Sequence, residues 1–208
     1  MTHTHVPTRR ANPLHAGYEI VTALSMTVGR GAAARTVAVV AAVGTDDRVV
    51  DIGCGPATAA REAARRGATV TGVDPAPAML RLARWITVVR RIGGLTWVQA
   101  SAESLPLPAA DATVVWALSS VHHWVDRAAA LGEVHRVLRP GGRVVLAERL
   151  VGPGARGHAA HGLTHGQADH LARELQELGF ADVRVETRRA ARRTLVVVHG
   201  RRLAGGAG

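Results

Sequence analysis

The chain has 208 residues, of which 47% are hydrophobic and 20% are charged. This length and apolar content predict one α/β domain with a substantial core. The only cysteine, Cys54, excludes an internal disulfide framework and a multi-cysteine metal site. No apolar run approaches the length of a membrane span, and the polar start has no signal-peptide core, so we expect a cytoplasmic protein that does not enter a membrane.

The formal net charge is +10 and the pI is about 11.6. All of the positive residues are arginine, and they are spread along the chain, often in pairs. A basic charge of this size is typical of proteins that bind nucleic acid. Aromatic residues make up only 3% of the chain, however, so few side chains are available to stack on bases. We therefore do not expect nucleic acid to be a partner.

One stretch near residue 50 predicts a ligand-binding turn. The apolar run 49–52 has the character of a buried parallel strand, and 57–65 is predicted to be the helix that follows. Gly53 and Gly55 lie between these two elements. Glycines between a strand and a helix allow backbone conformations closed to other residues and let a ligand lie against the main chain.

A carboxylate follows the next predicted strand, 68–73. Asp74 ends this strand roughly 20 residues after the glycines, which is the place of the acid that recognises ribose hydroxyls. The dinucleotide fingerprint requires a third glycine where this chain has Thr58, which speaks against a nicotinamide oxidoreductase. Asp51 lies two residues before Gly53, and a second acid there suits a cationic ligand better than a pyrophosphate.

The remaining elements alternate along the chain. A helix is predicted to begin at Asn12 and to end at residues 29–31. Further helices are predicted at 32–43, from Pro77 through Trp85, at 127–138 and at 167–178, and strands at 95–99, 111–118, 143–148, 181–186 and 193–199. This alternation predicts a doubly wound α/β sheet.

The stretch Asp51-Ile52-Gly53-Cys54-Gly55 resembles the first motif, D-x-G-x-G-x-G, of the class I S-adenosylmethionine-dependent methyltransferases, with Ala57 in place of the third glycine. Residues 73–80 are similar to the second motif of this family. Residues 100–108 are similar to its G-D-A-E-x-L-P-F-P segment, and 137–142 to a common V-L-R-P-G-G turn. The chain is most similar to the small-molecule, "methyltransferase type 11"-like members.

The resemblance implies a Rossmann-like sheet of about seven strands, mostly parallel with an antiparallel last strand, and helices on both faces. It implies one methyltransferase domain over 12–200. Within it we expect N-terminal helices at 12–45, a cofactor-binding core at 46–150 and a variable connector at 151–166, with flexible tails at 1–11 and 201–208.

The resemblance also implies S-adenosyl-L-methionine as cofactor. In the family, the first acid lies near the methionine amino group, the glycines lie under the amino-acid part, and the second acid binds the ribose. The expected cofactor-binding residues are Asp51, Gly53, Gly55, Asp74, Pro75, Ser101, Ala102 and Ala117. Ser101 stands where the family usually has an acid that contacts the adenine amino group.

Histidines are the candidates for acid–base chemistry. His122 and His123 follow the fourth strand, across the switch point of the sheet from the glycine turn, and we expect one of them to face the methyl acceptor. Four further histidines lie in or just after the glycine-rich connector: His158, His161, His165 and His170. Glycines between them argue against a rigid cluster, so we expect a lid or substrate loop and no metal site.

The expected reaction is in-line transfer of a methyl group to an O, N, S or C nucleophile of a small molecule. A protein that binds S-adenosylmethionine without catalysis is the main alternative. A nucleic-acid methyltransferase would need an added recognition domain or an Asn/Asp-Pro-Pro-aromatic motif after the fourth strand, and Ser119-Ser120-Val121 is not that motif. Neither the acceptor nor the oligomeric state follows from the sequence.

Overall fold

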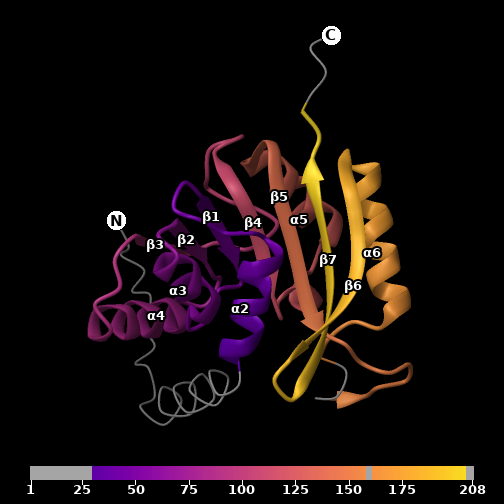
Figure 1. Ribbon diagram of the computed structural model, residues 1–208, viewed down its shortest axis with the longest axis horizontal. Helices are drawn as coiled ribbons and strands as arrows, with labels where there is room; N and C mark the ends of the chain where they lie inside the picture. The colour runs from indigo at the N-terminus through magenta and orange to yellow at the C-terminus, as the bar shows by residue number, and fades with distance from the viewer. Residues whose placement is uncertain (1–29, 158–160, 205–208) are drawn as a thin grey trace, which may run out of the picture.

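The computed structural model describes residues 30–157 and 161–204, which form a sheet with helices on both faces (Figure 1). The strands are β1 (Arg48–Ile52), β2 (Thr69–Val73), β3 (Leu95–Val98), β4 (Ala112–Leu118), β5 (Leu138–Arg149), β6 (Phe180–Ala190) and β7 (Arg193–Arg202). The helices are α2 (Arg30–Val40), α3 (Thr58–Arg65), α4 (Pro77–Val89), α5 (Arg127–Val137), α6 (His165–Glu177) and the 3-10 turn η1 (Val121–His123).

The seven strands lie in the order β3-β2-β1-β4-β5-β7-β6. β1 pairs in parallel with β2 on one side and with β4 on the other. The β2–β3 and β4–β5 pairs are also parallel. β7 runs antiparallel to both of its neighbours, β5 and β6. The predicted mostly parallel sheet with an antiparallel last strand is confirmed.

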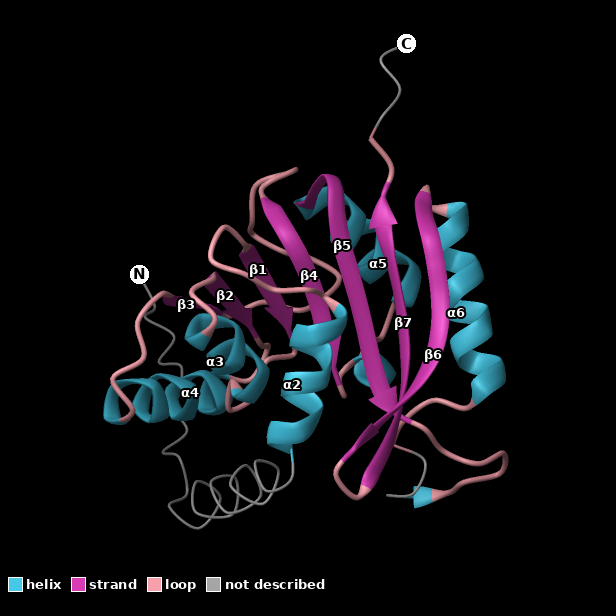
Figure 2. Cartoon of the chain, in the orientation of Figure 1, coloured by secondary structure: helices cyan, strands magenta, loops and turns pink. Residues whose placement is uncertain are grey.

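Helices cover the two faces of the sheet unequally. α2, α3 and α4 lie on one face, and α5 and α6 lie on the other (Figure 2). β4 lies between the two layers, and all seven of its residues are buried, including Trp116. A strand that is buried on both faces carries a continuous apolar run, which is why Ala112–Leu118 has almost no polar residue.

Local sequence fixes several element ends. Pro77 occupies the first turn of α4, where its missing N–H costs nothing. The Asp126 side chain caps α5 by accepting from the Ala129 N–H at 3.0 Å. α6 begins two residues before the predicted position, because Thr164 and Gln167 form a capping box.

Three boundaries differ from the sequence prediction. The Arg-Pro-Gly-Gly segment 139–142 was expected as a turn before the fifth strand, but β5 already begins at Leu138. Its pairing with β4 jumps from Ala112↔Leu138 to Val114↔Arg143, so that 139–142 form a bulge within β5. β6 is longer than predicted because its hairpin with β7 continues to Ala190, and β7 extends to Arg202, into the segment expected as a tail.

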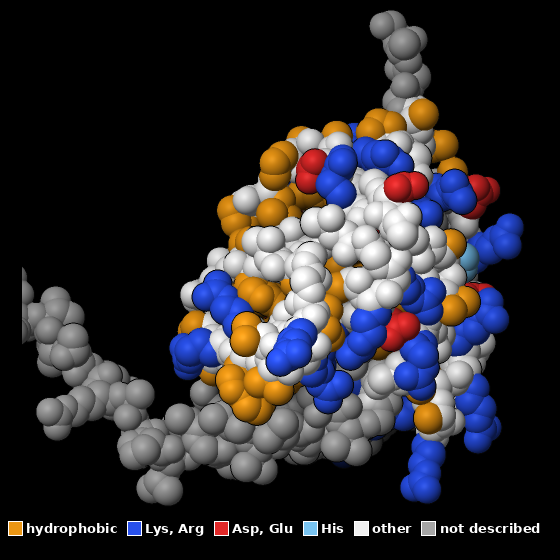
Figure 3. All heavy atoms as spheres, turned by 60° about the vertical axis from the view of Figure 1, so that its left-hand side comes forward, with side chains coloured by type: hydrophobic (Ala, Val, Ile, Leu, Met, Phe, Trp, Pro, Cys, Tyr) orange, Lys and Arg blue, Asp and Glu red, His pale blue; other side chains and the backbone are white. Residues whose placement is uncertain are grey.

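Some expectations lie outside the described residues: the tail 1–11, the helix predicted from Asn12, and His158. Within 30–157 and 161–204, no helix is both long and apolar enough to cross a bilayer. Arginine side chains are scattered over the face of the molecule shown in Figure 3 and do not gather into one stripe.

Candidate active site

A cavity of about 480 Å³ opens at the carboxyl ends of the central strands. The strand order reverses between β1 and β4, and open α/β sheets bind their ligands at this point. We call it the cofactor cavity. Six of the predicted cofactor-binding residues line it: Gly53, Gly55, Asp74, Pro75, Ser101 and Ala102.

The Asp74 carboxylate is held in a fixed orientation at the edge of the cofactor cavity. Its Oδ2 accepts from the Gly55 N–H at 2.8 Å, and its Oδ1 accepts from the Ala76 N–H at 2.9 Å. Asp74 is only 7% exposed. An ionised carboxylate has about four lone-pair sites, so two remain for a ligand diol. The geometry therefore suits the predicted contact with a ribose.

The two glycines of the turn have different surroundings, although both have positive φ. A Cβ on Gly53 would lie 2.4 Å from the Ser120 Cβ and 2.7 Å from its Oγ, because Ser120 packs directly on the turn. A Cβ on Gly55 would meet nothing within 4 Å. Gly53 is thus required for packing, and Gly55 leaves open space beside the backbone. Ala57, at the third glycine position of the motif, also adopts a left-handed conformation with φ 63°.

We expect Gly53→Ala and Gly55→Ala to affect different properties. The Gly53 variant should lower the free energy of unfolding by about 2–5 kcal/mol, because backbone strain and the clash with Ser120 add together. The Gly55 variant should lose less stability but bind S-adenosylmethionine more weakly, because its methyl group enters the cofactor cavity. Denaturant unfolding and calorimetry on both variants would measure this. Equal loss of stability in the two would contradict it.

Two predicted cofactor residues do not reach the cavity wall. Side chains alternate along a strand, and Ile52 lines the cavity, so the neighbouring Asp51 points to the opposite face, under α3. Burial raises the pKa of Asp51 to about 7, although contacts with Trp116 and Arg61 lower it. Ala117 is fully buried in the core. Asp51 and Ala117 do not line the cofactor cavity, and their contact with the cofactor stays a prediction.

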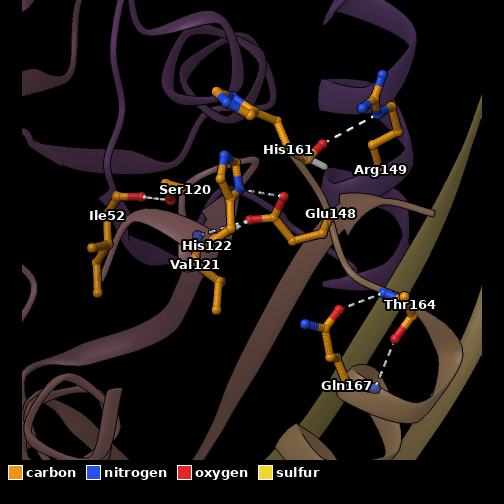
Figure 4. Close-up of polar contacts among 9 residues, drawn as sticks. All are labelled: Ile52, Ser120, Val121, His122, Glu148, Arg149, His161, Thr164 and Gln167. Carbon is orange, nitrogen blue, oxygen red and sulfur yellow. Dashed lines mark hydrogen bonds and ion pairs between the residues drawn. The ribbon is translucent and has the colours of Figure 1, made fainter. Parts of the chain in front are cut away.

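The His122 ring is hydrogen bonded to a buried acid (Figure 4). Its Nδ1 lies 3.0 Å from Oε2 of Glu148, which is 1% exposed. The other Glu148 oxygen accepts from the Val121 N–H at 2.8 Å. Among the described residues, nothing hydrogen bonds to the buried Nε2 of His122. An imidazole oriented through Nδ1 with Nε2 unoccupied has the arrangement of a general base with its orienting carboxylate.

A second, smaller cavity of about 130 Å³ adjoins the first. We call it the arginine cavity. It is lined by Arg30, Ser119, His122, His123, Arg149, His161 and Arg193. Arg30, Ser119 and His123 line both cavities, so the two share a wall. Ser119 has φ 56°, an uncommon conformation for this residue type, and such residues are concentrated at functional sites.

Three histidines meet at the arginine cavity. The ring centroids of His122 and His123 are 3.9 Å apart, and His161 lies 5.3 and 5.7 Å from them. A nitrogen of each ring lies within 4.8 Å of the others, close enough to share a metal ion. Three arginines line the same cavity, however, and their charge opposes a cation. We therefore assign no metal to these residues.

Three features of the site were not predicted from the sequence: Glu148, Arg30 and the position of His161. Glu148 is an acid at the carboxyl end of a parallel strand, which was a usable signal. The partners of His161 depend on the path of the connector, on which Leu163 bridges to Leu150. His165 and His170 begin and continue α6 and do not line either cavity. His170 pairs instead with Glu174 at 3.6 Å.

Comparison with known proteins agrees with this geometry. The methyltransferase domain family matches residues 50–146. The chain is 37% identical over 113 residues to the 27-O-demethylrifamycin SV methyltransferase of Amycolatopsis mediterranei, covering 53% of this chain and 42% of that protein.

Two solved structures share the fold. One is a putative methyltransferase of Haloferax volcanii in complex with the Trm112 activator, with a TM-score of 0.75, 18% identity, and coverage of 91% of this chain and 97% of that one. The other is the [4+2]-cyclase SpnF, with a TM-score of 0.71, 18% identity, and coverage of 84% and 82%.

The chain spans about half, or less, of the length of the curated relatives it matches. The glycine turn, Asp74 and a seven-stranded sheet with an antiparallel β7 occur together in this chain. The family match covers the strands and turns that build the cofactor cavity. Residues 50–146 match the methyltransferase domain family, and the sheet has the fold of solved S-adenosylmethionine-dependent methyltransferases.

Proposed function

We propose that this protein transfers the methyl group of S-adenosylmethionine to a nucleophilic O, N, S or C atom of a small molecule. The observation that carries the proposal is the position of the His122–Glu148 pair beside the cofactor cavity. Cofactor residues and a candidate base then lie on two sides of one site. Positioning supplies most of the rate in such a reaction, since donor and acceptor must be held in line at near-attack distance.

When bound, S-adenosylmethionine supplies an electrophilic methyl group. The residues of the cofactor cavity would hold it as follows. Asp74 would accept hydrogen bonds from the ribose hydroxyls with its two remaining lone-pair sites. The open space at Gly55 would let the methionine part lie along the main chain. Ser101 would accept from the adenine amino group, with Pro75 and Ala102 beside the ring.

The histidines would act on the acceptor. His122 would take the acceptor proton at Nε2, while Glu148 holds Nδ1–H and stabilises the imidazolium that forms. His123 lines both cavities and would contact donor and acceptor where they meet. Burial lowers the pKa of His123, and the nearby His122, His161 and Arg30 lower it further. The lowered pKa favours the neutral ring, which can also accept a proton.

The test is incubation with methyl-labelled S-adenosylmethionine and a panel of small hydroxyl, amine, thiol and carboxylate acceptors. Label in a product supports the proposal. Binding without any labelled product would favour the alternative, a non-catalytic S-adenosylmethionine-binding protein. The [4+2]-cyclase SpnF has the same fold, so the product must be identified and not only the consumption of an acceptor. If NAD displaces S-adenosylmethionine from the protein, a nicotinamide oxidoreductase becomes the favoured function.

A nucleic-acid substrate is the other alternative, and the basic charge provides its test. Because the arginines are scattered, we expect binding to generic duplex or single-stranded nucleic acid to be weak and to vanish near physiological salt. Fluorescence anisotropy across a salt series would measure it. Tight binding that persists at physiological salt, with a steep dependence at lower salt, would instead make nucleic acid the substrate.

A further inference from the structure

The arginine cavity has an unbalanced charge. Arg30, Arg149 and Arg193 line it together with three histidines and the Ser119 hydroxyl. No acidic residue is among its lining residues in the described part of the chain. Glu148 lies behind His122, and its oxygens already accept from the Val121 N–H and pair with the His122 ring.

The positive charges come from three separate elements. Arg30 begins α2, Arg149 ends β5 and Arg193 begins β7, and the antiparallel pairing of β5 with β7 brings the latter two to one end of the sheet. Within 30–157 and 161–204, no carboxylate forms a salt bridge with Arg30 or Arg193. Burial lowers the pKa of the Arg30 guanidinium, the charge of Arg193 lowers it further, and the charge of Glu148 raises it in part.

Like charges held close together cost free energy, and a bound anion lowers that cost. Guanidinium groups bind carboxylate and phosphate oxygens in pairs of parallel hydrogen bonds, which is the strongest form of anion recognition available to a side chain. The charge that disfavours a metal ion at the three histidines therefore favours an anion.

We infer, on the basis of the proposed function, that the arginine cavity binds an anionic group of the methyl acceptor, a carboxylate or a phosphate. A water molecule occupies about 30 Å³ of liquid. The cavity of about 130 Å³ is thus large enough for one such group with a few atoms attached, and too small for a whole drug-sized ligand. The anion serves as an anchor, and the rest of the acceptor lies outside this cavity.

The shared wall decides where that remainder goes. Arg30, Ser119 and His123 line both cavities, so an acceptor anchored on the arginines reaches the cofactor cavity across Ser119 and His123. His122 lies beside this path with its Nε2 unoccupied. An anchored anion would place a neighbouring hydroxyl, amine or thiol between the imidazole and the donor. The protein would then select an acceptor first by the charge of its anchoring group and second by its nucleophilic atom.

The experiment measures binding of three probes to the full chain saturated with S-adenosylhomocysteine: benzoate, phenyl phosphate and benzamide. Benzamide has the shape of benzoate without the charge. Isothermal calorimetry or ligand-observed NMR should show at least one of the two anions binding about tenfold more tightly than benzamide. Arg193→Gln and Arg149→Gln should each remove most of this preference. Arg84→Gln, on the exposed side of α4, is the matched control and should keep it.

The outcomes separate this inference from the proposed function. The affinity of Arg193→Gln for S-adenosylhomocysteine should be unchanged, because Arg193 lines only the arginine cavity. Benzamide binding as tightly as both anions would overturn the inference, and so would an anion preference retained in both arginine variants. Wild-type protein that fails to bind S-adenosylhomocysteine would contradict the proposed function instead, and the three probes compared without it would still test the cavity. If one arginine variant does not fold, the other decides.

Discussion

Replacing His122 with alanine is expected to lower turnover by about 10²–10⁴-fold, the usual contribution of a general base. The acceptor is the one that the labelling screen identifies. Nε2 of His122 is the proton-accepting atom, and Glu148 at 3.0 Å from Nδ1 fixes the ring orientation. Affinity for S-adenosylmethionine should remain nearly the same, because His122 does not line the cofactor cavity. Steady-state kinetics and calorimetry on the same preparation would separate the two effects.

The pH profile gives a second measurement of the same role. A base must be neutral to accept a proton, so the wild-type rate should fall as the pH drops through the range where the imidazole protonates. The low-pH limb should disappear in His122→Gln. Glu148, His123 and His161 face this ring, and three arginines line the same cavity.

Glu148→Gln tests whether the acid works through the histidine. Glutamine keeps the size of the side chain but does not stabilise an imidazolium, so turnover should fall and the low-pH limb should move to lower pH. His170→Ala, in α6, is the matched control and should keep wild-type turnover. Full turnover in single variants at both His122 and His123 would show that these residues are structural and that positioning alone carries the reaction.

Asp74→Ala is expected to weaken binding of S-adenosylmethionine by about 1.5–3 kcal/mol, the range for hydrogen bonds to a charged group. The Asp74 carboxylate also holds the Gly55 and Ala76 N–H groups, so the alanine variant loses part of the turn as well. Asp74→Asn keeps one side-chain acceptor and should fall between wild type and alanine. Calorimetry would measure the affinities, and thermal melting would confirm that both variants are folded.

The matched control for Asp74 is Asp111→Ala. Asp111 pairs with Arg48 at 3.2 Å on an exposed surface, and it lines neither cavity. Exposed pairs of this kind contribute little to stability, so this variant should bind the cofactor as wild type does. An Asp74→Ala variant that folds and binds with unchanged affinity would remove the ribose assignment.

The parts of the site that were predictable lie within short stretches of sequence. Gly53, Gly55 and Asp74 follow from two adjacent strands and the helix between them, and their places on the cavity wall are those predicted. The doubly wound α/β sheet was predictable for the same reason, because each strand and helix shows its own hydrophobic periodicity in the sequence. The orientation of Asp51 was also readable, because Ile52 and Asp51 must face opposite sides of β1.

The remaining parts depend on contacts between distant segments. Glu148 and His122 are 26 residues apart in the sequence, and they meet only because β5 lies beside β4. His161 and Arg193 reach the same cavity through the connector and the hairpin of β6 and β7. No local pattern encodes which surface residues such long-range pairings bring together. His122 and His123 were predicted as site residues from their position after the fourth strand. Their partners could be identified only in the three-dimensional structure.

The place of β7 in the sheet has a consequence for how the chain reaches its native state. Residues 193–202 are near the end of the sequence, yet they lie inside the sheet between β5 and β6. During synthesis β5 therefore stays an open edge until residues 193–202 have been made, and its pairing with β7 is of high contact order. Glu148 and Arg149 belong to that edge. The end of β5 that carries them is thus completed after β1 to β4, and a chain shortened before residue 193 would expose β5 to aggregation.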